Sequence, residues 1–192
     1  MNNIIDVIAH NKIIPIIDLP SVPEVLMVVE QLLAKNITTI ELTLRNKEVA
    51  VAAAKEISRV FGSNLILGLG TIKTPDEFSL AVDCGAQYIV SPGITRTLLQ
   101  KSTEHPQIPY LPGVITASEV MLALEFNIHY LKLFPAHASN SLGLLKSFYG
   151  PFKMVKFCAT GGITLENQND YLIQPNVFAV GMSNTNCIIV LG

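Results

Sequence analysis

Short runs of β-branched and apolar residues recur along the chain, and segments with helical periodicity lie between them. Four such segments carry apolar side chains at the i, i+3, i+4 and i+7 positions, with Ser, Thr or Asn near the start and Gly or Asn near the end: residues 21–36, 46–61, 74–85 and 116–127. The short runs predict eight buried strands: residues 13–18, 38–44, 65–71, 88–93, 109–114, 130–136, 154–160 and 177–183.

The alternation of strands and helices predicts an α/β fold with right-handed crossovers and a parallel sheet. Eight units of this size suit a small (β/α)8 TIM barrel in a single domain, residues 1–192, and an open doubly wound sheet is the alternative. After the eighth strand only "NTNCIIVLG" remains, which is too short for the helix that would close the barrel. We therefore expect this C-terminal helix to be absent or to lie beyond the given sequence, or another chain to cover the gap.

Composition narrows the class of protein. Hydrophobic residues make up 49% of the chain and charged residues 15%, as expected when strands are buried on both faces. Asp6, His10, Lys12 and Asp18 interrupt the apolar opening segment, so we expect neither a membrane span nor a secretory signal. The net charge of -2 and the lack of a basic cluster argue against a nucleic-acid partner.

The cysteines and histidines point away from metal or disulfide chemistry. Cys84, Cys158 and Cys187 are odd in number and contain no CxxC pair, which predicts free thiols and a cytoplasmic location. The four histidines show neither HxxxH nor HxH spacing. This spacing argues against a metal site, with a site assembled across loops as the alternative, and we expect no metal and no cofactor.

Strand parity places polar groups inside the predicted barrel. In "TTIELTLRN" the apolar Ile40, Leu42 and Leu44 are expected to face the helices, because side chains alternate along a strand. Glu41, Thr43 and Arg45 then face the lumen, with Arg45 at the C-terminal mouth where barrel enzymes place their active sites. The alternative is an interior ion pair that only fills space.

The same parity sends Lys132 of "YLKLFPA" into the lumen, together with Tyr130 and Phe134. Alternatively, this lysine extends to solvent from a wrongly assigned sheet edge. Burial lowers the pKa of an amine and so increases the neutral fraction, which attacks ketones to form Schiff bases. Glu41 would then be placed to move protons.

Turns after the strands supply further candidates. Thr71 ends the third strand, and Pro92 follows the fourth. Gly161 and Gly162 follow the seventh strand and Ser183 the eighth, the two loops between which barrels commonly bind phosphate. A glycine pair can also serve only to allow a positive φ angle, so the phosphate site is one of two interpretations.

With these residues in place, the chain resembles the bacterial 2-keto-3-deoxy-6-phosphogluconate (KDPG) and 4-hydroxy-2-oxoglutarate (KHG) aldolases. The resemblance rests on six motifs in order: "IELTLRN", "GLGT", "SPGIT", "LPGVITASE", "LKLFPA" and "CATGGIT". It implies a Schiff-base lysine at Lys132 and a general acid/base at Glu41. It also implies a set of substrate-binding residues: Arg45 and Thr71 for the carboxylate, Pro92 and Phe134 for the pocket wall, and Thr160, Gly161, Gly162 and Ser183 for the distal, phosphate-bearing end.

The implied activity is a class I aldolase that cleaves KDPG to pyruvate and glyceraldehyde 3-phosphate, and also KHG to pyruvate and glyoxylate. The resemblance further implies a metal-free homotrimer that acts on a small 2-keto acid. Three positions depart from the family pattern: Leu69 replaces Ala, Met182 replaces a glycine and is expected to narrow the phosphate pocket, and His137 replaces an acidic residue. Two other functions remain open: a phosphate-binding barrel isomerase or decarboxylase in which Lys132 is only electrostatic, and a non-catalytic metabolite-binding barrel.

Overall fold

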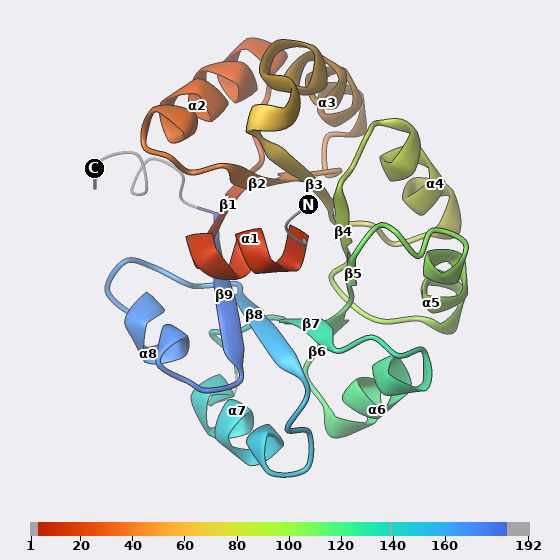
Figure 1. Ribbon diagram of the computed structural model, residues 1–192, viewed down its shortest axis with the longest axis vertical. Coiled ribbons are helices and arrows are strands. Elements are labelled where there is room, and N and C mark those ends of the chain that lie inside the picture. The colour runs from red at the N-terminus through yellow and green to blue at the C-terminus, as the bar shows by residue number, and fades with distance from the viewer. Residues whose placement is uncertain (1–3, 139, 184–192) are drawn as a thin grey trace.

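The computed structural model describes residues 4–138 and 140–183, and these form a nearly closed barrel of parallel strands (Figure 1). Around the sheet the strands run in the order β5-β4-β3-β2-β1-β9-β8-β7-β6. Their bounds are β1 Ile13–Ile17, β2 Thr39–Thr43, β3 Ile66–Gly70, β4 Tyr88–Val90, β5 Tyr110–Leu111, β6 Gly113–Val114, β7 Tyr130–Leu133, β8 Lys156–Thr160 and β9 Val177–Met182.

Pro112 explains why nine strands occur where eight are predicted. It divides the fifth predicted strand into β5, which pairs with β4, and β6, which pairs with β7. Proline has no N–H to donate, so the ladder is interrupted at this residue, but its carbonyl still accepts a hydrogen bond from the Lys132 backbone N–H at 2.9 Å. The two short strands are thus the two halves of one predicted strand. Together they link β4 to β7 and complete the ring of strands. The alternative of an open doubly wound sheet is therefore wrong.

Helices surround the barrel on the outside (Figure 1). The four predicted helices are confirmed as α2, α3, α4 and α6, and each begins after an Asn, Ser or Thr whose side chain accepts a backbone N–H. The helices α1, α5, α7 and α8 were not among the predicted ones. The bounds are α1 Ile4–Asn11, α2 Val22–Ala34, α3 Lys47–Phe61, α4 Pro75–Asp83, α5 Arg96–Thr103, α6 Ala117–Glu125, α7 Ser141–Tyr149 and α8 Gln168–Leu172, with a 3-10 turn, η1, at Gly62–Asn64.

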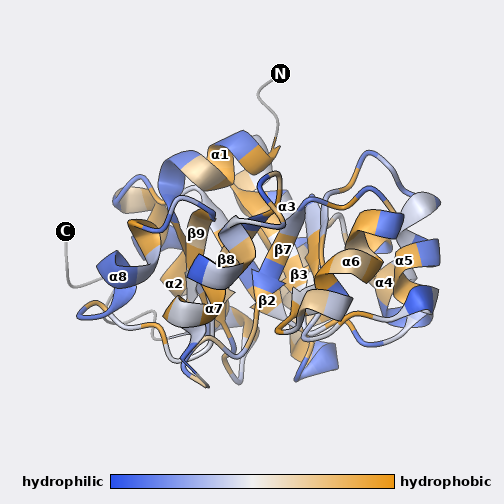
Figure 2. Ribbon diagram, turned by 90° about the horizontal axis from the view of Figure 1, so that it is seen from below, coloured by the Kyte–Doolittle hydropathy of each residue, from blue (hydrophilic) through white to orange (hydrophobic). Residues whose placement is uncertain are grey.

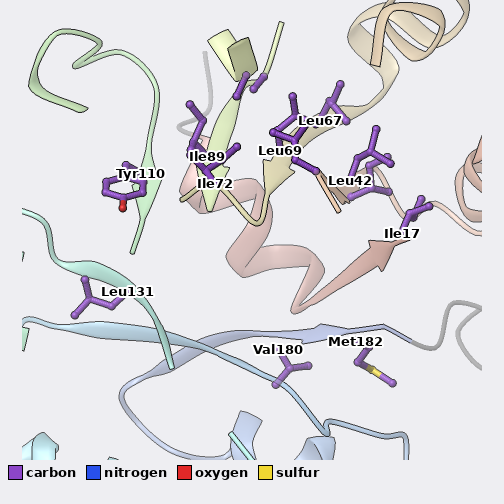
Figure 3. Packing of buried hydrophobic residues seen from close by; sticks show 14 of the residues in the cluster. Ile17, Leu42, Leu67, Leu69, Ile72, Ile89, Tyr110, Leu131, Val180 and Met182 are labelled. Carbon is purple, nitrogen blue, oxygen red and sulfur yellow. The ribbon is translucent and has the colours of Figure 1, made fainter. Parts of the chain in front are cut away.

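Apolar side chains form two layers on opposite faces of the strands. Outward-facing residues such as Leu42, Leu69 and Leu131 pack in the layer between strands and helices (Figure 3). A smaller cluster fills the lumen and includes Ile14, Val90, Leu111 and Ala179. Burial on both faces accounts for the apolar composition.

The helix α1 covers the end of the barrel at which the strands begin (Figures 1 and 2). Ile5 and Ile8 on this helix join the lumen cluster, and Ile8 is fully buried. The C-terminal ends of the strands lie opposite this helix. Among the described helices, none is long and apolar enough to cross a membrane. The predicted absence of a closing helix concerns residues 184–192, which lie outside the described part of the chain, as does Cys187.

Candidate active site

A lysine and a glutamate meet inside the barrel. The Nζ atom of Lys132 on β7 lies 3.6 Å from Oε1 of Glu41 on β2, and their side chains are 8% and 4% exposed. Leu131, which precedes Lys132, and Leu42, which follows Glu41, pack outward against the helices. Strand parity therefore predicted both lumen positions correctly, and Lys132 does not extend to solvent.

Glycines on β3 provide the space that this pair needs. A side chain at Gly70 would overlap the carboxylate of Glu41, and a side chain at Gly68 would overlap the ring of Tyr88. Tyr88 fills the lumen below the pair and donates a hydrogen bond from its hydroxyl to the Ile40 carbonyl at 2.7 Å. The ring of Tyr88 therefore closes the lumen on one side of the pair.

An aromatic ring and a thiol complete the surroundings of the lysine. The Nζ atom of Lys132 lies 5.1 Å from the ring centroid of Phe134, a cation–π distance. Cys158 on β8 pairs in register with Lys132, and its Sγ lies 3.7 Å from Oγ1 of Thr160. Burial raises the pKa of the Cys158 thiol to about 12, although the Thr160 hydrogen bond and the Lys132 charge oppose this shift. The thiol is therefore protonated and not a nucleophile at neutral pH.

The turns after β8 and β9 lie side by side. Gly161 and Gly162 follow β8 with φ angles of 96° and 73°, and Ser183 follows β9 and is exposed. Thr160 and Gly181 are partners in register, so the two turns leave the sheet at neighbouring points. Positive φ angles also occur in the backbone nests that bind anions, so the conformation of this turn is compatible with the predicted phosphate site.

His137 lies against the glycine turn. Its backbone N–H donates to the Gly161 carbonyl at 2.9 Å, and its Nδ1 lies 3.3 Å from the same oxygen. A side chain at Gly162 would overlap the Cβ of His137, and one at Gly161 would approach the Phe134 ring to 3.2 Å. The position at which the chain departs from the family pattern therefore borders the predicted phosphate corner.

Arg45 is located at the rim of the barrel and not inside it. Its side chain is 63% exposed, and Nη1 donates to Oδ2 of Asp18 at 2.9 Å. Asp18 directly follows β1, and we did not predict this partner, because the contact depends on the pairing of β1 with β2. Thr71 follows β3, is half-buried and adopts a left-handed φ of 65°.

Pro92, a predicted residue of the pocket wall, lies in the turn after β4. A side chain at Gly113 would overlap the Pro92 carbonyl, so the turn packs closely on β6. The preceding Ser91 is fully buried and shares a 2.7 Å hydrogen bond with the Tyr110 hydroxyl. The fourth turn is thereby held against the fifth strand.

Two of the three departures from the family pattern do not face the site. Met182 is 1% exposed and packs with Val180 in the layer between strands and helices (Figure 3). Our expectation that Met182 narrows the phosphate pocket was wrong, because parity on β9 turns Gly181 inward and Met182 outward. Leu69 is fully buried in the same outer layer.

A separate cavity of about 450 Å³ opens at the opposite end of the barrel. It is lined by residues near the start of β5 and β7, including Pro109, Phe126 and Tyr130, and by Ile5 of α1. It contains neither Lys132 nor Glu41, and parallel barrels use the other end for chemistry. Within residues 4–138 and 140–183, no group of three or more His, Cys, Asp or Glu side chains is arranged to hold a metal ion.

The fold and the site define a (β/α)8 barrel in which an amine and a carboxylate face each other inside the lumen. A family model described as "KDPG and KHG aldolase" matches residues 4–188. The chain therefore belongs to the KDPG and KHG aldolase family.

Individual relatives agree with this assignment. A 2-dehydro-3-deoxy-phosphogluconate aldolase from Pseudomonas aeruginosa is 39% identical over 88% of this chain and 76% of the relative. A KHG/KDPG aldolase from Escherichia coli K12 is 34% identical over 92% of this chain and 82% of the relative. A crystal structure of KDPG aldolase from Legionella pneumophila contains pyruvate captured as a covalent carbinolamine intermediate. Its sequence is 38% identical to this chain. The two structures superimpose with a TM-score of 0.87 over 92% of this chain and 84% of that chain.

Proposed function

We propose that this protein is a class I aldolase that cleaves KDPG to pyruvate and glyceraldehyde 3-phosphate, and KHG to pyruvate and glyoxylate. The observation that carries the proposal is the buried pair of Lys132 and Glu41, 3.6 Å apart at the centre of the lumen. A buried ion pair contributes little net stability once desolvation is counted, so a role in chemistry explains its position better than a role in folding. Relatives named for this activity match over most of the chain.

The first half of the reaction forms the Schiff base. The neutral amine of Lys132 attacks the C2 ketone, and the ketone oxygen takes up a proton to give a carbinolamine. Glu41, next to Nζ, takes the proton from the amine and returns one to the C2 hydroxyl, which leaves as water. An iminium at C2 results.

The second half breaks the carbon–carbon bond. A base removes the proton of the C4 hydroxyl, the C3–C4 bond breaks, and its electron pair moves to the iminium to give an enamine. The aldehyde formed from C4 departs. A proton then adds to C3, and water hydrolyses the regenerated iminium, which releases pyruvate and restores the Lys132 amine. Glu41 is the carboxylate placed to carry these protons.

The ends of the substrate are assigned to opposite parts of the mouth. Arg45 and Thr71, after β2 and β3, suit the C1 carboxylate, because a guanidinium and a hydroxyl both donate to carboxylate oxygens. Gly161, Gly162 and Ser183, after β8 and β9, suit the phosphate, and this is supported by the positive φ angles of both glycines. Thr160, Phe134 and Pro92 complete the wall between them.

Reduction with borohydride in the presence of pyruvate tests the mechanism directly. We expect a covalent adduct on Lys132, detected by mass spectrometry of peptides. Lys132→Met should prevent the adduct and lower kcat by about 10³-fold or more. Lys156→Met is the matched control, because Lys156 also lies on a strand but donates to the Pro175 carbonyl at the opposite end. No adduct on the folded wild-type protein would refute the proposal.

Substrate range and metal dependence are tested by pyruvate release from KDPG and from KHG in the presence of EDTA. We expect turnover of both keto acids and no effect of the chelator. Loss of activity in EDTA would instead indicate a metal-dependent aldolase.

Assembly and organisation form part of the proposal. The family resemblance supports a homotrimer, and light scattering of the purified protein measures the subunit number. We also propose a single catalytic domain over residues 1–192 in the cytoplasm, which the buried free thiols of Cys84 and Cys158 support. Limited proteolysis and cell fractionation test these two points.

A further inference from the structure

Thr43 is a buried residue of the lumen to which the proposed reaction assigns no role. It ends β2, two residues after Glu41 and two before Arg45, and its side chain is on the lumen face because Leu42 and Leu44 pack outward. The residue is 4% exposed, and its Oγ1 is buried without a hydrogen-bond partner among the described residues.

This separates Thr43 from the other buried hydroxyls of the described chain. Thr39, on the same strand and face, accepts a hydrogen bond from Asn11 Nδ2 at 3.0 Å. Ser91 pairs with Tyr110, Ser141 with Tyr171, and Thr160 lies next to the Cys158 thiol. A buried hydroxyl without a partner is unfavourable, and a valine of the same shape would avoid this cost. Stability therefore does not explain a threonine at this position.

The surroundings of Thr43 are those of the reacting groups. Its partner in register is Gly70, which has no side chain, and the carboxylate of Glu41 occupies the space beside that glycine. Residues two apart on a strand are separated by about 7 Å. Thr43 therefore lies midway between the group that serves C2, at Glu41, and the group assigned to the C1 carboxylate, at Arg45.

We propose that the Thr43 hydroxyl donates a hydrogen bond to the C1 carboxylate of the bound 2-keto acid. This inference rests on the proposed aldolase function. A keto acid joined to Lys132 through C2 has its carboxylate one bond further on, and a carboxylate directed from Glu41 toward Arg45 would lie beside Thr43. Since β1 and β9 separate β2 from the glycine turn after β8, Thr43 contacts the pyruvate half, which KDPG and KHG share.

The test compares Thr43→Val and Thr43→Ser with the wild-type protein. Thr43→Val should raise KM by about tenfold or more, because it removes a hydrogen bond to a charged group. The factor should be the same for KDPG and KHG, and the pyruvate concentration for half-maximal borohydride trapping should rise equally. The melting temperature should stay the same or increase. Thr43→Ser, which retains the hydroxyl, should stay within about threefold of wild type.

Thr39→Val is the matched control on the same strand and face. It removes a hydroxyl that has a partner, so it should lower the melting temperature and leave KM unchanged. If Thr43→Val leaves KM and trapping unchanged, or lowers the melting temperature without affecting KM, the inference is wrong. Should Thr43→Val fail to fold, Thr43→Ala provides the same comparison of KM and trapping. Failure of the wild-type protein to trap pyruvate would instead refute the aldolase function, so the two failures are distinguishable.

Discussion

The Glu41 carboxylate occupies the space beside Gly70 that any larger side chain would require. Gly70 lies on β3 opposite Thr43, so the carboxylate of β2 bends over the neighbouring strand to reach Lys132 of β7. The glycine thus determines the position of the proposed acid/base group without contacting substrate. This dependence leads to a first prediction.

Gly70→Ala should displace the Glu41 carboxylate and lower kcat by about 100-fold or more, because small misplacements of a catalytic group are costly. Overpacking should also reduce the free energy of unfolding by about 1–3 kcal/mol. Steady-state kinetics and urea unfolding measure the two effects. Gly150→Ala is the control, because a methyl group there meets no atom within 4 Å. Full activity of a folded Gly70→Ala protein would contradict the observed position of Glu41.

Met182→Ala should destabilise the protein without changing its preference for phosphorylated substrate. Met182 is buried in the layer between strands and helices, and truncation of such a residue costs about 2–5 kcal/mol. The ratio of kcat/KM for KDPG and KHG should stay constant. Met154→Ala, at a residue that is 75% exposed, should change stability by less than about 0.5 kcal/mol. A changed substrate ratio with unchanged stability would place Met182 in the mouth.

The free energy of unfolding should decrease at alkaline pH. Burial raises the pKa of both Cys158 and Tyr110 to about 12, and the Ser91 hydrogen bond only partly offsets the shift of Tyr110. Between about pH 9 and 12 the unfolded chain loses protons that the folded protein keeps. The contribution of these two groups to the free energy of unfolding is therefore fully present below this range and decreases as the pH rises through it. Urea unfolding at several pH values measures the slope. In Cys158→Ala the decrease in the free energy of unfolding at the lower end of this pH range should become smaller. If its pH dependence is unchanged, the raised pKa of Cys158 is contradicted.

Asp18→Asn should lower the KM for keto acids. The guanidinium of Arg45 forms an ion pair with the Asp18 carboxylate. Removal of this carboxylate should leave the guanidinium free to bind the proposed substrate carboxylate. We expect a decrease of about two- to fivefold, and a change in stability below about 1 kcal/mol because the pair is exposed. Kinetics of Asp18→Asn and of the exposed control Asp76→Asn provide the comparison. A rise in KM would show that Asp18 orients Arg45 and does not compete for it.

Strand parity was sufficient to predict the centre of the site. Alternation along two strands placed Glu41 and Lys132 in one lumen, because period two in sequence corresponds directly to the two faces of a strand. Parity also holds at Met182, which faces outward like Val180. Our expectation that Met182 narrows the phosphate pocket relied on the family pattern and not on this alternation along the strand.

Contacts between strands could not be read in the same way. The clearance at Gly70 and the pairing of Arg45 with Asp18 depend on the register between neighbouring strands, which the sequence of one strand does not specify. The helix α1 was missed because the polar residues of the opening segment were considered only as interruptions of a membrane span. Its signal was present in the spacing of Ile4, Ile5 and Ile8.

The helix α1 has a consequence for the order of binding and release. Ile5 and Ile8 pack in the lumen cluster at the end where the strands begin, so we expect substrate to approach the Lys132–Glu41 pair from the C-terminal end of the strands. In the proposed mechanism pyruvate is joined to Lys132 inside the lumen, and the aldehyde lies on the side of the C-terminal end of the strands. We therefore expect the aldehyde to leave first in cleavage and pyruvate to bind first in synthesis, so that a helix at the far end of the barrel favours an ordered kinetic sequence.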